Sequence, residues 1–452
     1  MKREKLGSRL GFILLSAGCA IGIGNVYKFP YIAGQNGGAI FVLIYAACLL
    51  LLGLPVMTME FSMGRAAQKS PVLMYDELAP KTPWRIHGWL CLLGNVLLLM
   101  CYCTIAGWLL QYFVTTAGGG FAGLDASGVA AVFGDVISNT GSMTVYTLTV
   151  VALATIVCSF SLQGGLERVT KWMMLALLSI MIVLAVNSCL LPGGQEGLKF
   201  YLLPSWQRFT EAGISNVIVA AMNQSFFSLS LGIGAMAIFG SYLGKERTLM
   251  GEAINVVLLD TFVAFCAGLI IFPACYAYGV EPNAGASLLF ITLPNVFNNM
   301  VGGQIWGSLF FVFMSFAALS TVFAVFENIV SCIRDLTGWE RRKTSLVVGG
   351  CLAVLCMPCV LGMTAWSHIT ILGLSIMDFE DFLVNNILLP FGSLVFAIFC
   401  VCRYGWGWNK FVAEANEGTG LKVAKWMRPY MTYAVPVIIT FIFCYGLYNF
   451  FR

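Results

Sequence analysis

Residues 18–25 read GCAIGIGN and residues 228–234 read SLSLGIG, so each stretch centres a Gly-Ile-Gly within a long apolar segment. Glycine costs a helix interior about 1 kcal/mol relative to alanine. A helix that breaks in the middle of a bilayer leaves backbone groups that need a ligand or water. Glycine also serves close helix packing in membranes. Two matching pairs nevertheless favour two interrupted helices with a binding site at the breaks.

The composition places these segments in a lipid bilayer. Of the 452 residues, 59% are hydrophobic and 10% are charged, and the mean hydropathy is +0.86. A soluble domain carries about 25% charged residues, so a soluble, disordered or secreted disulfide-rich protein is excluded. We predict an all-α polytopic membrane protein that forms one transmembrane domain over residues 1–452. Its eleven predicted spans, each long enough for a bilayer, are 11–36, 39–64, 86–117, 143–162, 170–191, 214–242, 250–279, 304–333, 345–366, 372–402 and 430–451.

The positions of the two Gly-Ile-Gly stretches predict an internal symmetry. They lie in spans 1 and 6, five spans apart, so they run through the membrane in opposite directions. This arrangement is expected for an inverted 5+5 repeat with broken helices 1 and 6. The repeats would cover about 11–191 and 214–402, followed by an additional helix at about 430–451.

Charge predicts the orientation of the spans. Of the 25 Lys and Arg residues, 21 fall on the side that holds the N-terminus, and Lys28 lies within a span. The other side holds only Lys199, Arg208 and Arg452. Cytoplasmic connections carry the excess of basic residues. We therefore expect a multi-pass plasma-membrane protein, as in a bacterial inner membrane, with a cytoplasmic N-terminus and an extracellular C-terminus.

Oxygen-bearing side chains lie close to both predicted breaks. They are Asn25 in span 1 and Ser228 and Ser230 in span 6, and a further pair, Ser320 and Thr321, lies in span 8. An unwound helix also exposes carbonyls for a cation and N–H groups for an anion, and hard cations prefer oxygen ligands. Serine and threonine within a helix often bond their own backbone, so a structural role for the span 8 pair stays open.

Several carboxylates lie in apolar spans, where charge is costly and usually functional. Asp260 has no basic neighbour in sequence, which favours a bound cation; a protonated Asp260 bonded to another helix and a pair with Lys28 are the alternatives. Glu60 is expected to cap the freed N–H groups of a broken helix. Asp378 and Asp381, near the start of span 10, form either a buried ion pair or a gate with Lys28.

Enzyme chemistry finds no support in the sequence. No GxSxG, HExxH or P-loop pattern occurs, and His87 and His368 are not spaced as a ligand pair. We predict that the protein is not an enzyme and has no organic cofactor, and we expect no nucleic acid as a partner.

Several specific motifs, spread over nearly the whole chain, resemble the neurotransmitter:sodium symporter family, especially its bacterial amino acid transporters. They are RLGF at 9–12, GIGNVYKFPY at 22–31, EFSMGR at 60–65, Tyr102 with Gly107-Trp108, and QSFFSLSLG at 224–232. The resemblance implies a symporter that imports a neutral, hydrophobic L-amino acid with sodium by alternating access. The partners would then be a small amino acid, sodium ions and the lipid bilayer.

The resemblance also implies roles for individual residues. One sodium ion would be held by the Ala20 carbonyl, Asn25, Ser228, Asp260 and the substrate carboxylate. A second would be held by the carbonyls of Gly18, Ile21 and Ala317 and the hydroxyls of Ser320 and Thr321. The substrate carboxylate would meet the amides of Ile23 and Gly24 and the Tyr102 hydroxyl, and its ammonium group the carbonyls of Ala20, Phe227 and Ser230. The side-chain pocket would be lined by Leu98, Tyr102, Phe227, Ile233, Thr321 and Val325, with Phe227 as the outer lid.

The same resemblance implies two gates. The outer gate would pair Lys28, which replaces the arginine usual in the family, with Asp378 or Asp381. The inner gate would pair Arg3 with Asp335, next to Leu6 where the family has tryptophan.

In the family that the sequence resembles, members that need chloride have an uncharged residue where this chain has Asp260. The Asp260 carboxylate therefore predicts chloride independence. A non-transporting amino acid receptor or sensor and a transporter of an amine or betaine are the alternatives.

Overall fold

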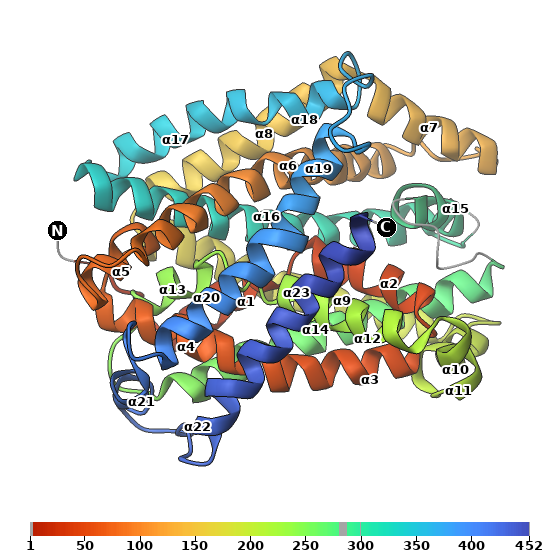
Figure 1. The fold of residues 1–452 in the computed structure, drawn as a ribbon. Coiled ribbons are helices and arrows are strands. Elements are labelled where there is room, and N and C mark those ends of the chain that lie inside the picture. Colours follow the sequence, from red (N-terminus) through yellow and green to blue (C-terminus); the bar gives the residue numbers. More distant parts are fainter. Residues whose placement is uncertain (1–2, 280–286, 299, 452) are drawn as a thin grey trace.

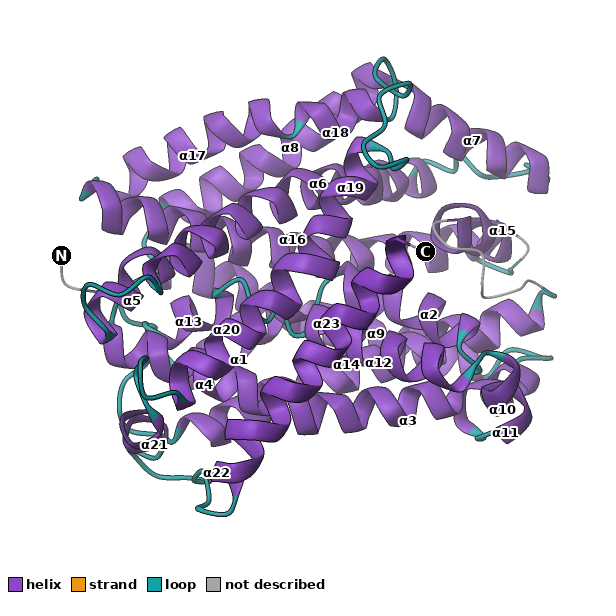
Figure 2. Ribbon diagram, in the orientation of Figure 1, coloured by secondary structure: helices purple, strands orange, loops and turns teal. Residues whose placement is uncertain are grey.

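The structure is a computed structural model that describes residues 3–279, 287–298 and 300–451, and all regular secondary structure in these ranges is helical (Figures 1 and 2). The helices up to residue 202 are α1 (Arg9–Ala20), η1 (Gly24–Lys28), α2 (Phe29–Gln35), α3 (Ala39–Cys48), η2 (Leu49–Gly53), α4 (Leu54–Ala67), α5 (Pro71–Leu78), α6 (Arg85–Ala117), α7 (Ala126–Ser138), α8 (Thr140–Ser159), η3 (Gln163–Glu167), α9 (Arg168–Cys189) and α10 (Gln195–Leu202). The remainder are α11 (Trp206–Glu211), α12 (Ile214–Ser228), α13 (Ala235–Gly240), α14 (Leu249–Ala277), η4 (Leu288–Thr292), α15 (Leu293–Asn298), α16 (Gly303–Thr337), α17 (Arg341–Leu355), α18 (Met357–Gly362), α19 (Ile376–Phe382), η5 (Leu383–Leu388), α20 (Leu389–Val401), α21 (Trp408–Ala415), α22 (Met427–Pro429), η6 (Tyr430–Ala434) and α23 (Val435–Phe451).

The membrane-spanning helices agree with an all-α polytopic protein. Within the described residues, nine helices are long and apolar enough to cross a bilayer, or ten if the bent pair that starts with α1 counts as one span. The predicted span 214–242 is divided between α12 and α13, which are each shorter than such a helix. The number eleven and the inverted repeat therefore stay predictions.

Both Gly-Ile-Gly stretches interrupt their helices. Helix α1 ends at Ala20, and the chain bends by 57° before continuing through η1 and α2. Helix α12 ends at Ser228 and α13 begins at Ala235. Between them Gly232 has φ +97°, and a Cβ there would lie 2.1 Å from the Leu389 carbonyl oxygen. Only glycine fits this backbone, because a larger residue would be strained and would also clash with α20.

The helices pack in layers around the two interrupted segments. In Figure 1, α8 and α17 lie along the upper side and α3 along the lower side, while α1, α6 and α16 lie between them. The middle of α16 is buried without a break from Ala317 to Cys332. This arrangement places the breaks of both helices in the interior, where their free backbone groups face other protein groups.

Candidate functional site

Two cavities meet at the breaks, with Phe227 between them. The smaller cavity measures about 10 Å³ and is lined by Ala20, Gly24, Leu98, Tyr102, Phe227, Ser230, Ile233, Thr321 and Leu389. The larger measures about 240 Å³ and is lined by Ile23, Gly24, Tyr27, Lys28, Tyr31, Cys101, Tyr102, Ile105, Trp108, Phe227, Leu289, Phe290, Met377, Asp378 and Asp381. A Cβ on Gly24 would lie 2.5 Å from the Phe227 ring. The ring therefore lies directly over the Gly24 backbone and separates the two spaces.

Most of the predicted substrate residues come together here. Eight line the smaller cavity, and Ile23 lines the larger one. Val325 is fully buried in α16 but lines neither cavity. Ser228, which is predicted to hold both substrate and sodium, also lines neither cavity and donates a hydrogen bond to Asp260. Leu389, at the start of α20, was missed in the sequence, because nothing in an apolar run indicates which leucine turns toward a distant helix.

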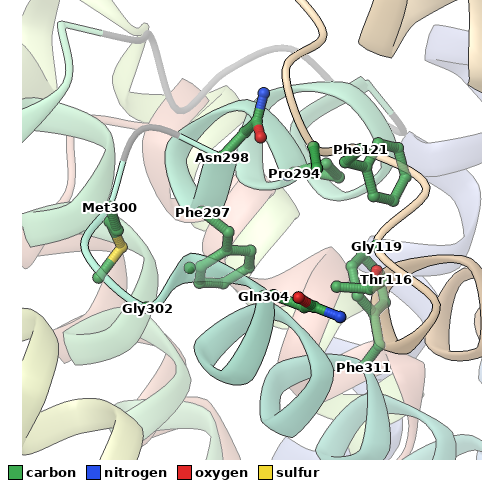
Figure 3. A pocket seen from close by; sticks show the side chains of 12 residues that line it. Thr116, Gly119, Phe121, Pro294, Phe297, Asn298, Met300, Gly302, Gln304 and Phe311 are labelled. Atoms are coloured by element: carbon green, nitrogen blue, oxygen red, sulfur yellow. The ribbon is translucent and has the colours of Figure 1, made fainter.

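A third cavity lies away from all of these residues (Figure 3). It measures about 290 Å³ and lies between the end of α6, α15 and the start of α16. Phe297, Phe311 and Gln304 are among its lining residues. It contains no predicted site residue, so cavity size alone does not locate the site.

Asp260 in α14 holds the centre of a buried polar cluster. Its side chain is fully buried and accepts hydrogen bonds from Asn25 Nδ2 at 2.6 Å and Ser228 Oγ at 2.6 Å. The Tyr45 hydroxyl lies 3.4 Å from the same carboxylate and 2.6 Å from Ser228 Oγ. All of these donors are neutral. Tyr45 was missed in the sequence, since an aromatic residue in an apolar helix gives no sign of a polar role.

The cluster leaves one acceptor oxygen without a partner among the described residues. Asn25 Oδ1 is buried and makes no hydrogen bond, while its amide nitrogen is fixed by Asp260. A buried acceptor of this kind costs about 1–3 kcal/mol unless something binds it. Carboxylate, hydroxyl and carboxamide oxygens together suit a hard cation. Lys28 is paired elsewhere, so the predicted alternative of a Lys28–Asp260 pair is not what the structure contains.

A second group of oxygens lies between α1 and α16. Thr321 Oγ1 lies 3.2 Å from the Gly18 carbonyl, 3.5 Å from that of Ile21 and 3.4 Å from that of Ala317. Ser320 Oγ lies 2.9 Å from the Ala317 carbonyl and 3.5 Å from that of Ile21. Each hydroxyl has a single proton to donate. Thr321 Oγ1 also lies 3.4 Å from the Cys19 carbonyl, so two hydroxyls face four carbonyls. Oxygen lone pairs are therefore available to a cation, and the donor set fits sodium.

The break in the second helix is capped as predicted. Glu60 in α4 is fully buried and accepts a hydrogen bond from the Gly232 backbone N–H at 2.7 Å. On the opposite side, Gln224 Nε2 donates to the Gly24 carbonyl at 2.9 Å. These side chains satisfy backbone groups that the interrupted helices leave free, so they hold the shape of the site without lining it.

The outer pair joins Lys28 to Asp381. Lys28 Nζ lies 3.5 Å from Asp381 Oδ2 and 4.2 Å from the centre of the Phe227 ring. Asp378 accepts a hydrogen bond from Ser375 at 2.7 Å instead. The structure thus chooses between the two carboxylates that the sequence left open. This single contact of a lysine is weaker in geometric specificity than a bidentate arginine–carboxylate pair.

The inner pair is more extensive. Arg3 contacts both carboxylate oxygens of Asp335, at 3.1 and 3.2 Å, and donates to Ser241 and Ser331 at 2.8 and 2.7 Å. Glu167, at the end of η3, accepts hydrogen bonds from the backbone N–H groups of Gly7 and Ser8. Leu6, in the same N-terminal segment as Arg3, packs against the core.

Glu4 joins the N-terminal segment to the C-terminal end of α16. Its carboxylate lies 2.5 Å from Arg334 and 3.4 Å from Arg341. Burial alone would raise the pKa of Glu4, but Arg341 and Arg334 together hold it below its ordinary value. Sequence reasoning missed this residue because it is one of several charges in a polar N-terminus.

Comparison with known proteins identifies the family to which the chain is similar. The model of the sodium:neurotransmitter symporter family matches residues 3–120 and 127–452. The uncharacterized sodium-dependent transporter YhdH of Bacillus subtilis (strain 168) is 35% identical over 99% of both chains. The sodium-dependent serotonin transporter of Drosophila melanogaster is 24% identical over 98% of this chain and 76% of its own. The crystal structure of MhsT in complex with L-phenylalanine is similar at 34% identity, with a TM-score of 0.88 over 98% of this chain and 100% of that one.

Proposed function

The chain belongs to the sodium:neurotransmitter symporter family and is a sodium-dependent membrane transporter, not an enzyme, and on that premise we propose that it imports a neutral, hydrophobic L-amino acid. The observation that carries the proposal is the lining of the smaller cavity. None of the described residues that line it is charged, and Leu98, Ile233 and Leu389 make its walls apolar. An apolar wall suits an aliphatic or aromatic side chain and disfavours a charged one.

The backbone at the breaks suits the zwitterionic end of such a substrate. Tyr102 and Ser230 line the cavity together with the Gly24 backbone. We assign the carboxylate to the amides of Ile23 and Gly24 with Tyr102. We assign the ammonium group to the carbonyls of Ala20, Phe227 and Ser230, which would accept its hydrogen bonds. Half-helix ends supply favourable partial charges for both groups.

We propose two sodium ions, one at each group of oxygens. The first involves the Ala20 carbonyl, Asn25, Ser228 and Asp260, and the second lies between α1 and α16 at Gly18, Ile21, Ala317, Ser320 and Thr321. Each ion moving down about 100 mV contributes about 2.3 kcal/mol, and a roughly tenfold gradient adds about 1.4 kcal/mol. Two ions therefore supply about 7 kcal/mol, enough for about 10⁵-fold accumulation of a neutral substrate.

Phe227 supplies the closing step of the proposed mechanism. The smaller cavity has room for about one water molecule, so an amino acid enters only when the Phe227 ring moves off Gly24. Binding from the outside would be followed by closure of Phe227 and the Lys28–Asp381 pair. Opening of the Arg3–Asp335 pair would then release the substrate into the cytoplasm, because the proposed orientation puts the N-terminus on the cytoplasmic side. The Asp260 carboxylate provides negative charge within the site, and we propose that transport needs no chloride.

Uptake into proteoliposomes tests the proposal. An inward sodium gradient should drive accumulation of a labelled hydrophobic amino acid such as phenylalanine or leucine, and replacing chloride with gluconate should leave the rate unchanged. Unchanged uptake with choline in place of sodium would contradict the coupling. Competition by lysine or glutamate as strong as that by leucine would contradict the substrate class. Binding without accumulation in sealed vesicles would indicate a receptor.

A further inference from the structure

The connection between α20 and α23 carries an unbalanced positive charge. It contains five basic residues, Arg403, Lys410, Lys422, Lys425 and Arg428, all exposed. None of them has a carboxylate partner among the described residues. The two carboxylates of the same connection are already used, since Glu414 pairs with Arg65 at 2.6 Å and Glu417 with Lys245 at 2.9 Å.

Three of these cations alternate with exposed apolar side chains in residues 421–428. We call this stretch the basic segment. Lys422, Lys425 and Arg428 stand beside Leu421, which is 62% exposed, and Trp426, which is 72% exposed. The segment leads directly into the apolar helix Met427–Tyr448. Tryptophan is enriched where a span meets the lipid headgroups. Clusters of Lys and Arg immediately cytoplasmic of a span bind anionic lipids.

Hydrogen bonds tie the basic segment to the preceding part of its own connection, which is tied in turn to residues 246–248. The Asn416 side chain pairs with Val423, accepting from its N–H at 2.6 Å and donating to its carbonyl at 3.1 Å. Thr419 bonds the backbone of Glu246 and Thr248 at 3.0 and 3.3 Å. Figure 1 shows α21 toward the same end of the molecule as the N-terminus. The cations are thus fixed near the entry of the final span, on the side that the proposed orientation makes cytoplasmic.

We propose that the basic segment is a docking surface for the headgroups of anionic phospholipids. Lys422, Lys425 and Arg428 bind the phosphate charge, while Leu421 and Trp426 enter the headgroup boundary. Charge complementarity with an anionic leaflet is the observation that selects this partner. Each cation near such a surface strengthens attraction by about fivefold, so three give on the order of 100-fold preference at low salt.

Fluorescence quenching at Trp426 tests the proposal with the full chain in bilayers. The emission of Trp426 is obtained as the difference between the fluorescence of the parent and that of the W426F variant. We expect dibrominated phosphatidylglycerol to quench this emission far more than dibrominated phosphatidylcholine at equal mole fraction, and we expect the difference to shrink as salt rises. In K422Q/K425Q/R428Q the two lipids should quench alike.

The matched control is K5Q/R168Q/R342Q, which removes three exposed cations that lie apart from the basic segment on the same predicted side. It should keep the parent preference for phosphatidylglycerol. Equal quenching by both lipids in the parent would overturn the proposal. An equal loss of preference in the control would also overturn it, because general charge would then explain the effect. Quenching by neither lipid would overturn it in favour of a protein partner.

Discussion

Substituting Asp260 by asparagine separates the two roles left for this carboxylate. If Asp260 holds sodium as an ion, the substitution removes a full charge from a fully buried position. Opposite charges about 4 Å apart at an effective dielectric constant of about 20 attract by about 4 kcal/mol. The half-saturating sodium concentration should then rise by up to about 1,000-fold. If Asp260 is instead protonated, asparagine is a close substitute for the neutral acid and sodium affinity should hardly change.

The assay is sodium-dependent binding of labelled substrate to purified protein, titrated with sodium at constant ionic strength. Asp135→Asn makes the same chemical change at an exposed position in α7 and should leave the titration unchanged. Thermal melting in detergent checks that the Asp260 variant is folded. A folded Asp260→Asn protein with a half-saturating sodium concentration within threefold of the parent would refute the ligand role.

Three further perturbations follow from the geometry. Gly24→Ala places a Cβ 2.5 Å from Phe227 and should lower substrate uptake about tenfold by displacing the lid, whereas Gly350→Ala, with nothing within 4 Å, should transport normally in the same uptake assay. Thr321→Val removes a hydroxyl near four carbonyls and should weaken sodium binding about tenfold in the sodium titration, through loss of one ligand worth about 1–2 kcal/mol; an unchanged titration would argue against the second site. Because the pKa of Glu4 is lowered, its stabilising contribution is complete above the ordinary glutamate pKa and is lost as pH falls through the lowered value. The Glu4→Gln protein should have a free energy of unfolding about 1 kcal/mol lower than the parent near neutral pH. Its Tm should fall less than that of the parent on acidification, and parallel curves of Tm against pH would contradict this.

The local pattern of the sequence predicted the membrane environment and the breaks. A chain with 10% charged residues has too little polar surface to face water. Gly22 and Gly24 in one span and Gly232 and Gly234 in another mark places where a helix is least stable, and the helices end beside them. Oxygen-bearing residues near the breaks, such as Asn25, were identified for the same local reason.

Partner choice, in contrast, depends on distances across the fold. The sequence left Asp378 and Asp381 as equal candidates to pair with Lys28. Only the packed helices bring Asp381 to 3.5 Å from Lys28, while Ser375 donates a hydrogen bond to Asp378. Tyr45 likewise reaches Asp260 from a helix more than 200 residues away in sequence. Hydropathy and the positions of glycines are local properties of the sequence. Sequence alone therefore determined which segments enter the lipid and where the helices are interrupted. Hydrogen bonds require atoms within about 3 Å and ion pairs within about 4 Å, and only tertiary packing decided which of those atoms meet.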